Sequence, residues 1–119
     1  MATVTGTRTD GFTEGVFETW TPLTTANADG STATFVGAGD RVVQVVGTFG
    51  VGGTVIVEGS LDGTNWFGLR DPTSTAISFT AAGLKAILEA VPYVRPRVTA
   101  GDGTTSVTVK IYHRRNNSV

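Results

Sequence analysis

Apolar and polar residues alternate along much of the chain, which is the pattern of half-buried β-strands. Val107, Val109 and Ile111 fall on one side of such a strand, and Thr108 and Lys110 fall on the other. Similar β-branched runs recur, and we predict strands over residues 16–23, 32–36, 41–48, 54–60, 65–69, 75–79, 84–89, 93–99 and 105–113. This spacing indicates an all-β fold, an antiparallel β-sandwich or jelly-roll of about eight to nine short strands.

Asp-Gly pairs separate several of these runs, at residues 10–11, 29–30, 62–63 and 102–103. Glycine accepts positive φ and aspartate tolerates it, so the dipeptide suits tight turns. The polar positions therefore predict hairpin connections between the strands.

The segment 81–91 also fits a helix, because Leu84, Ile87 and Leu88 recur at helical spacing. Gly83 would then lie inside a very short helix, where glycine is unfavourable, and both neighbouring segments have the strand pattern. We favour a strand over residues 84–89, with a short helix as the alternative.

The two ends of the chain are poor in apolar residues. Residues 1–15 are rich in threonine and have little apolar surface to offset the entropy lost on ordering. The sequence predicts an extended N-terminal arm over 1–15 that orders only on a neighbour, one β-sandwich domain over 16–113, and a flexible C-terminal tail over 114–119.

Composition excludes several classes of partner. The 119 residues include no cysteine, so a disulfide framework or a thiolate metal site is not available. The formal net charge is −1, and without a basic excess we expect no nucleic acid partner. No apolar run approaches membrane-spanning length and no secretory leader pattern opens the sequence, so we expect no membrane and synthesis in the cytoplasm.

The charge is distributed unevenly along the chain. Residues 1–40 are predominantly acidic, whereas residues 93–119 are predominantly basic. Opposed patches of this kind could join copies of the same protein into a homo-oligomer, a dimer or a trimer. On charge alone, two solvated faces of a monomer are favoured.

We predict no catalytic, cofactor or metal site. His113 is the one histidine and has no cysteine to work with, so we expect it at the surface at a strand end. Glu58 and Asp62 could begin a glycosidase hypothesis, but strand-end and turn roles are favoured. The loop from Asp62 to Asn65 lacks the acidic series of an EF-hand, and residues 47–53 lack the Gly-Lys-Ser/Thr of a phosphate loop.

The two tryptophans receive different interpretations. Trp66 stands next to Phe67 on a predicted strand and is expected in the core. Trp20 lies beside Pro22 and follows the arm, so we expect it to contact a partner.

Three segments carry a family resemblance, residues 55–66, 79–83 and 93–109. Their strand and turn motifs resemble those of small β-sandwich virion proteins of tailed bacteriophages, and most of all the capsid decoration, or cement, proteins. The similarity covers about residues 41–113. Sugar-binding sandwich domains of phage tails and fibres have similar segments, so a module that binds host carbohydrate, through Trp20 or Tyr93, is the alternative.

The resemblance implies a non-enzymatic virion protein on the capsid outer surface that stabilises the capsid by bridging major capsid protein subunits. It assigns no functional residue by motif. From charge and expected exposure, we predict a basic and aromatic set that contacts the capsid. The set consists of Arg8, Phe12, Trp20, Arg70, Arg95 and Arg97.

Overall fold

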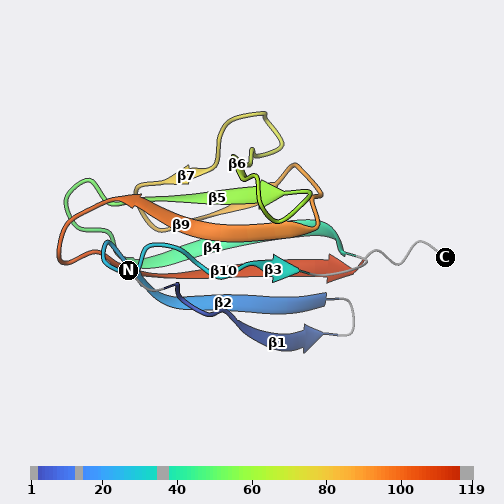
Figure 1. Ribbon diagram of the computed structural model, residues 1–119, viewed down its shortest axis with the longest axis horizontal. Helices are drawn as coiled ribbons and strands as arrows, with labels where there is room; N and C mark the ends of the chain where they lie inside the picture. The colour runs from blue at the N-terminus through green and yellow to red at the C-terminus, as the bar shows by residue number, and fades with distance from the viewer. Residues whose placement is uncertain (1–2, 13–14, 35–37, 116–119) are drawn as a thin grey trace.

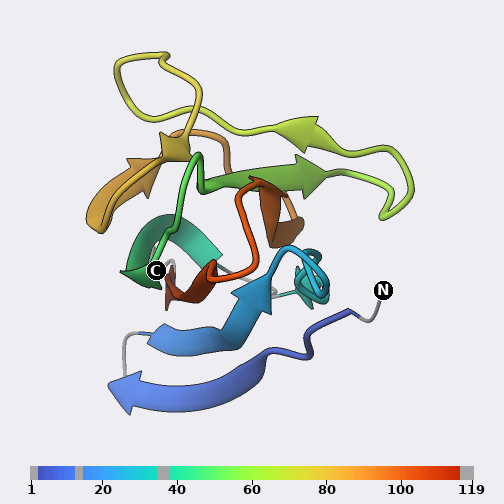
Figure 2. The same ribbon diagram turned by 90° about the vertical axis from the view of Figure 1, so that its left-hand side faces the viewer.

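The computed structural model describes residues 3–12, 15–34 and 38–115, which form two antiparallel β-sheets that pack face to face (Figure 1). The first sheet has the spatial order β1 (Thr7–Phe12), β2 (Gly15–Thr24), β10 (Ser106–Arg115), β4 (Ala38–Thr48), β8 (Gly83–Ile87). The second has the order β3 (Ala33–Thr34), β9 (Tyr93–Ala100), β5 (Thr54–Ser60), β6 (Phe67–Gly68), and β7 (Ser78–Phe79) also pairs with β5. In Figure 2, β1 and β2 (blue) lie on the opposite side of the molecule from β5 and β6 (green).

The core lies between the sheets and is built from the inward positions of the alternating strands. The buried apolar residues include Trp20, Leu23, Val43, Val45, Val55, Val57, Val94, Val107, Val109 and Ile111. Each buried aliphatic side chain among them contributes roughly 1.5–3 kcal/mol of transfer free energy when it leaves water. The period of two in the sequence therefore specifies which side of each strand faces the core.

Most predicted strands appear close to their expected bounds, and the all-β prediction is confirmed for the described residues. The strand predicted over 84–89 is present over Gly83–Ile87, because β8 pairs with β4 from Gly83 opposite Val45 to Ile87 opposite Arg41. The helical alternative is wrong: the pairing with β4 outweighs the helical spacing of the leucines. The jelly-roll form of the sandwich stays a prediction.

Residues 7–12 of the N-terminal segment belong to the first sheet, which corrects the expectation of a separate arm there; residues 1–2 and 13–14 lie outside the described part of the chain. β1 pairs with β2 from Thr7 opposite Thr19 onwards. Apolar content was a poor guide here, because a strand is held by main-chain hydrogen bonds and threonine favours strands. Likewise β10 continues to Arg115, beyond the predicted boundary at 113, and residues 116–119 lie outside the described residues.

Residues 28–31 connect the two sheets along one side of the sandwich. The Gly30 amide donates to the Pro96 carbonyl of β9 at 2.9 Å, and the Ser31 amide donates to the Val4 carbonyl at 2.7 Å. A Cβ on Gly30 would lie 2.6 Å from the Pro96 ring, so only glycine fits this approach without rearrangement. The described part of the chain has no helix that could span a membrane.

Candidate interaction surfaces

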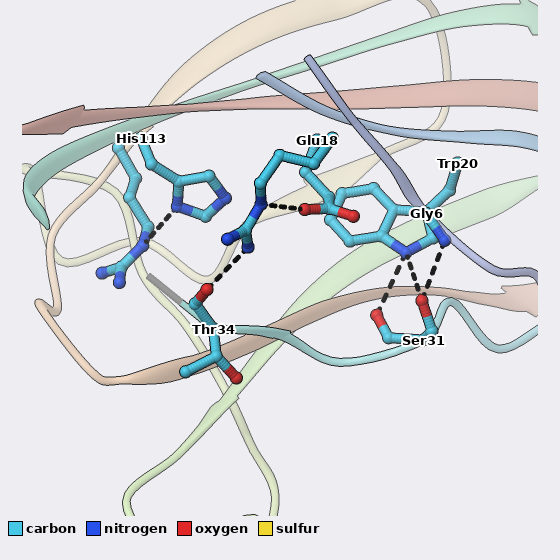
Figure 3. Close-up of polar contacts among 8 residues, drawn as sticks. Gly6, Glu18, Trp20, Ser31, Thr34 and His113 are labelled. Carbon is cyan, nitrogen blue, oxygen red and sulfur yellow. Dashed lines mark hydrogen bonds and ion pairs between the residues drawn. The ribbon is translucent and has the colours of Figure 1, made fainter. Parts of the chain in front are cut away.

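Trp20, predicted to contact a partner, is completely buried (Figure 3). Its indole Nε1 donates to the Ser31 carbonyl at 3.0 Å, and the Ser31 hydroxyl accepts the Gly6 amide at 2.9 Å. Trp20 occupies an inward position of β2, next to the segment that precedes β1. The prediction is therefore wrong: Trp20 joins the core and is not available to a partner while the sandwich is folded.

Arg8 fixes β1 onto the rest of the protein. Its Nε lies 2.9 Å from Oε1 of the buried Glu18 on β2, and its Nη2 donates to the Thr34 carbonyl of β3 at 2.6 Å (Figure 3). Arg8 therefore has a structural role inside the molecule, and its contact with the capsid stays a prediction. Phe12, the last residue of β1, has a side chain outside the described residues.

His113 is also buried, contrary to the expectation of a surface histidine. It shares the inner side of β10 with Ile111, and Nε of the buried Arg41 donates to His113 Nδ1 at 2.9 Å (Figure 3). An imidazole that accepts at Nδ1 is neutral, with its proton on Nε2. Burial, and then the positive charges of Arg41 and Arg8, lower the pKa of His113 to about 4. Because Arg41 is 4% exposed and His113 is completely buried, we assign this pair a structural role.

Two of the predicted contact residues, Arg95 and Arg97, lie on the outer side of the second sheet. Arg95 Nε lies 3.0 Å from Glu58 Oε1, and Arg97 Nη1 lies 3.6 Å from Glu58 Oε2. Arg97 Nε also lies 3.2 Å from Asp29 Oδ1. We call this row, formed by Asp29, Glu58, Arg95 and Arg97, the ion-paired face. Glu58, the candidate for glycosidase chemistry, is thereby engaged by two arginines.

Trp66 covers part of the ion-paired face and does not belong to the core. Its ring centroid lies 4.2 Å from Arg95 Cζ, and its side chain is half-buried. The core prediction for Trp66 is wrong, because the guanidinium of a neighbouring strand supplies the cover that a core would otherwise give. Arg70 lies elsewhere: its Nε is 2.7 Å from Glu89 Oε2, and its amide donates to Glu89 Oε1 at 2.8 Å.

The loop after β5 forms one wall of a pocket of about 460 Å³. Asp62 Oδ1 accepts hydrogen bonds from the Thr64 and Asn65 amides, both at 2.8 Å, as its predicted turn role requires. These backbone donors, Asn65 first, hold the pKa of Asp62 well below its usual range. Phe67, 70% exposed, stands at the pocket. The remaining lining residues are Gly59, Ser60, Leu61, Gly68, Leu69, Glu89 and Val91.

The outer side of the first sheet is a third surface, and sequence reasoning missed it. The rings of Phe17 on β2 and Tyr112 on β10 have centroids 5.0 Å apart, and Val46 on β4 and Leu84 on β8 are 41% and 64% exposed. Val42 is half-buried on the same side. We call the surface formed by Phe17, Val42, Val46, Leu84 and Tyr112 the apolar face. The signal that could have found it is the recurrence of large apolar or aromatic residues at the outward positions of these strands.

The described residues contain no group of three histidine or acidic residues placed to hold a metal ion. The fold is a two-sheet antiparallel β-sandwich. Its candidate interaction sites among the described residues are the ion-paired face, the pocket and the apolar face. Comparisons with protein-family models, with curated proteins and with solved structures found no match for this chain.

Proposed function

We propose that this protein is a non-enzymatic structural virion protein that binds the outer surface of an assembled phage capsid and bridges major capsid protein subunits. The observation that carries the proposal is a pair of unlike surfaces on the two outer sides of one sandwich, the apolar face and the ion-paired face. A bridging protein needs separate contact surfaces held at a fixed relation, here the ion-paired face for coat protein and the apolar face for a neighbouring subunit. The family resemblance of residues 55–66, 79–83 and 93–109 supports the assignment to a capsid. We further propose that the strands of the sandwich have jelly-roll connectivity.

The chemistry of the described residues supports a role in binding. The groups best suited to acid-base work, Glu58 and His113, are bound to Arg95 and Arg41, respectively. Asp62 is engaged by its own loop. A protein of this kind acts by contact area and geometry, and several modest contacts on one lattice give strong total binding because the later ones are effectively intramolecular.

The ion-paired face is the part of this protein that we assign to the capsid. Arg97 is 45% exposed although it approaches both Asp29 and Glu58, so part of its guanidinium remains open to solvent. A guanidinium has five N–H donors, so a partly exposed one can also bind a carboxylate or carbonyl of a coat subunit. Arg95, stacked on Trp66, is held in one orientation beside it.

The test is co-sedimentation of the purified protein with capsids that lack it, followed by heating of the loaded capsids. We expect saturable binding and a higher disruption temperature. Arg97→Glu should weaken binding about tenfold or more, because it reverses a charge in the contact. Arg114→Glu is the matched control, since Arg114 is an exposed, singly paired arginine on the other sheet. Absence of binding by the unmodified protein would refute the proposed function.

The pocket beside Phe67 supports a second candidate, a tail or fibre module that binds host carbohydrate. Sugar sites combine an aromatic surface with a few oriented polar groups, and Phe67 with Asp62 and Asn65 provides both. We expect Phe67→Ala to abolish any glycan-array signal, while Val51→Ala, at an even more exposed apolar site away from the pocket, leaves it unchanged. An array without signal for the folded protein would exclude this candidate.

A further inference from the structure

The apolar face presents almost no charge for its size. Between its apolar residues stand hydroxyl and amide side chains, and Thr21 and Thr108 are hydrogen-bonded to each other at 2.7 Å. Among the described outward positions of β2, β10, β4 and β8, the charged residues are Lys110 in the middle and the pair Asp40 and Arg114 at one end. Lys110 Nζ lies 5.6 Å from the Phe17 ring centroid, so its stem covers part of the same surface.

We propose that a second copy of this chain docks on the apolar face and forms a face-to-face homodimer. In a two-fold interface the same patch meets itself, so a charged patch would repel its copy while a nearly uncharged one does not. Homodimer interfaces are also more apolar than the remaining protein surface. The adjacent, tilted rings of Phe17 and Tyr112 provide the aromatic anchor that such interfaces favour.

The area of the apolar face is sufficient for a specific interface. At about 3.3 Å per residue, β2, β10 and β4 are roughly 33 to 36 Å long and β8 is roughly 17 Å long. With about 4.8 Å of width for each strand, they give about 500 to 600 Å² from each copy, so a dimer buries about 1,100 Å². That total is just above the roughly 1,000 Å² that a specific interface needs, so we expect a weak dimer with a micromolar dissociation constant.

The edge strands of the first sheet disfavour edge-to-edge assembly, which favours self-association through the apolar face. Each edge strand carries a cation directed towards the interior side: Arg8 on β1 is bound to Glu18, and Lys85 on β8 lies 3.9 Å from Asp71 and 5.7 Å from the Phe79 ring centroid. Inward-pointing charges on edge strands obstruct the addition of another strand. Copies of the chain are therefore steered away from a continuous sheet, and the apolar face is left for contact through side chains.

The test is analytical ultracentrifugation of the full chain between about 1 and 200 µM, a range that brackets the affinity expected of so small an interface. We expect a monomer–dimer equilibrium. Leu84→Lys should weaken dimerisation tenfold or more, whereas Leu61→Lys should not change it, because Leu61 is even more exposed than Leu84 but lies at the pocket. Thermal unfolding of both variants verifies that they fold.

A second charged variant strengthens the test: Leu84→Glu should weaken dimerisation as much as Leu84→Lys does, because either charge would have to be buried in the interface. A wild-type protein that remains monomeric over the whole range, or equal effects of the two lysine variants, would overturn the proposal. If the protein is monomeric and Leu84→Lys abolishes capsid binding, the apolar face binds coat protein instead. The inference does not depend on the capsid proposal, since a dimer that ignores capsids would refute only the latter.

Discussion

The buried pair of His113 and Arg41 makes the stability of this protein depend on pH in a defined window. The folded protein keeps His113 neutral down to a pKa of about 4, whereas the ordinary value is 6.5. Below pH 6.5 the unfolded chain therefore binds a proton that the folded chain does not. Stability is unaffected above this value, falls as the pH decreases towards about 4, and is not lowered further by this residue below that.

The size of the effect follows from the two pKa values. A shift of one unit corresponds to about 1.4 kcal/mol, so the change from 6.5 to about 4 amounts to about 3 kcal/mol at most. The conversion is justified because His113 is fully buried. Since small proteins are stable by only about 5–15 kcal/mol, the loss should be readily measured.

Urea unfolding at intervals between pH 7.5 and 4.5 measures this loss. The free energy of unfolding should fall by about 2 to 3 kcal/mol over that interval. Carboxylates such as Asp62 and Asp102 do not interfere, because their pKa values are lowered and the stability they contribute is lost only at more acidic pH. Replacement by leucine, His113→Leu, should flatten the dependence whatever its effect on stability at neutral pH.

The single histidine also permits a direct observation. The imidazole proton signals of His113 in an NMR titration of the folded protein should not move between pH 7.5 and 5. If they titrate with a midpoint near 6.5, the side chain is solvated in the folded state and the reasoning fails. This measurement does not depend on whether His113→Leu folds.

Three further predictions test the packing and the loops. Gly30→Ala should destabilise the protein by about 1 to 3 kcal/mol in urea unfolding, because its Cβ would meet the proline ring of β9, whereas Gly103→Ala, with nothing within 4 Å, should cost far less. Deletion of residues 2–12 should lower the thermal transition and shift Trp20 fluorescence to longer wavelength; an unchanged transition would show that β1 does not stabilise the sandwich. Asp62→Ala should speed hydrogen exchange of the loop amides that it now binds, and unchanged exchange rates would contradict its capping role.

The sequence predicts the strands well because alternation is a local property that reflects which side of a strand is buried. It fails for the tryptophans because their environments depend on distant residues. Trp20 is enclosed with the help of Ser31 and the segment before β1, and Trp66 is covered by Arg95 from another strand. The alternation along β10 indicates the inward side for His113 as well, because His113 continues the inward series of Ile111. The expectation of a surface histidine followed the residue type instead of this alternation.

The ion pairs within the molecule weaken the case for electrostatic attraction between copies of the chain. The acidic first part and basic last part of the chain suggested attraction between copies, yet the two parts meet within one molecule: Arg97 pairs with Asp29, and Arg114 approaches Asp40 at 3.5 Å. Charges that are already paired internally gain little from a second copy. Exposed apolar side chains such as Val46 and Leu84 do gain from burial against a second copy, so the driving force for association shifts to the apolar face. Self-association on that basis should persist in salt, because screening acts on charges and leaves apolar burial unaffected.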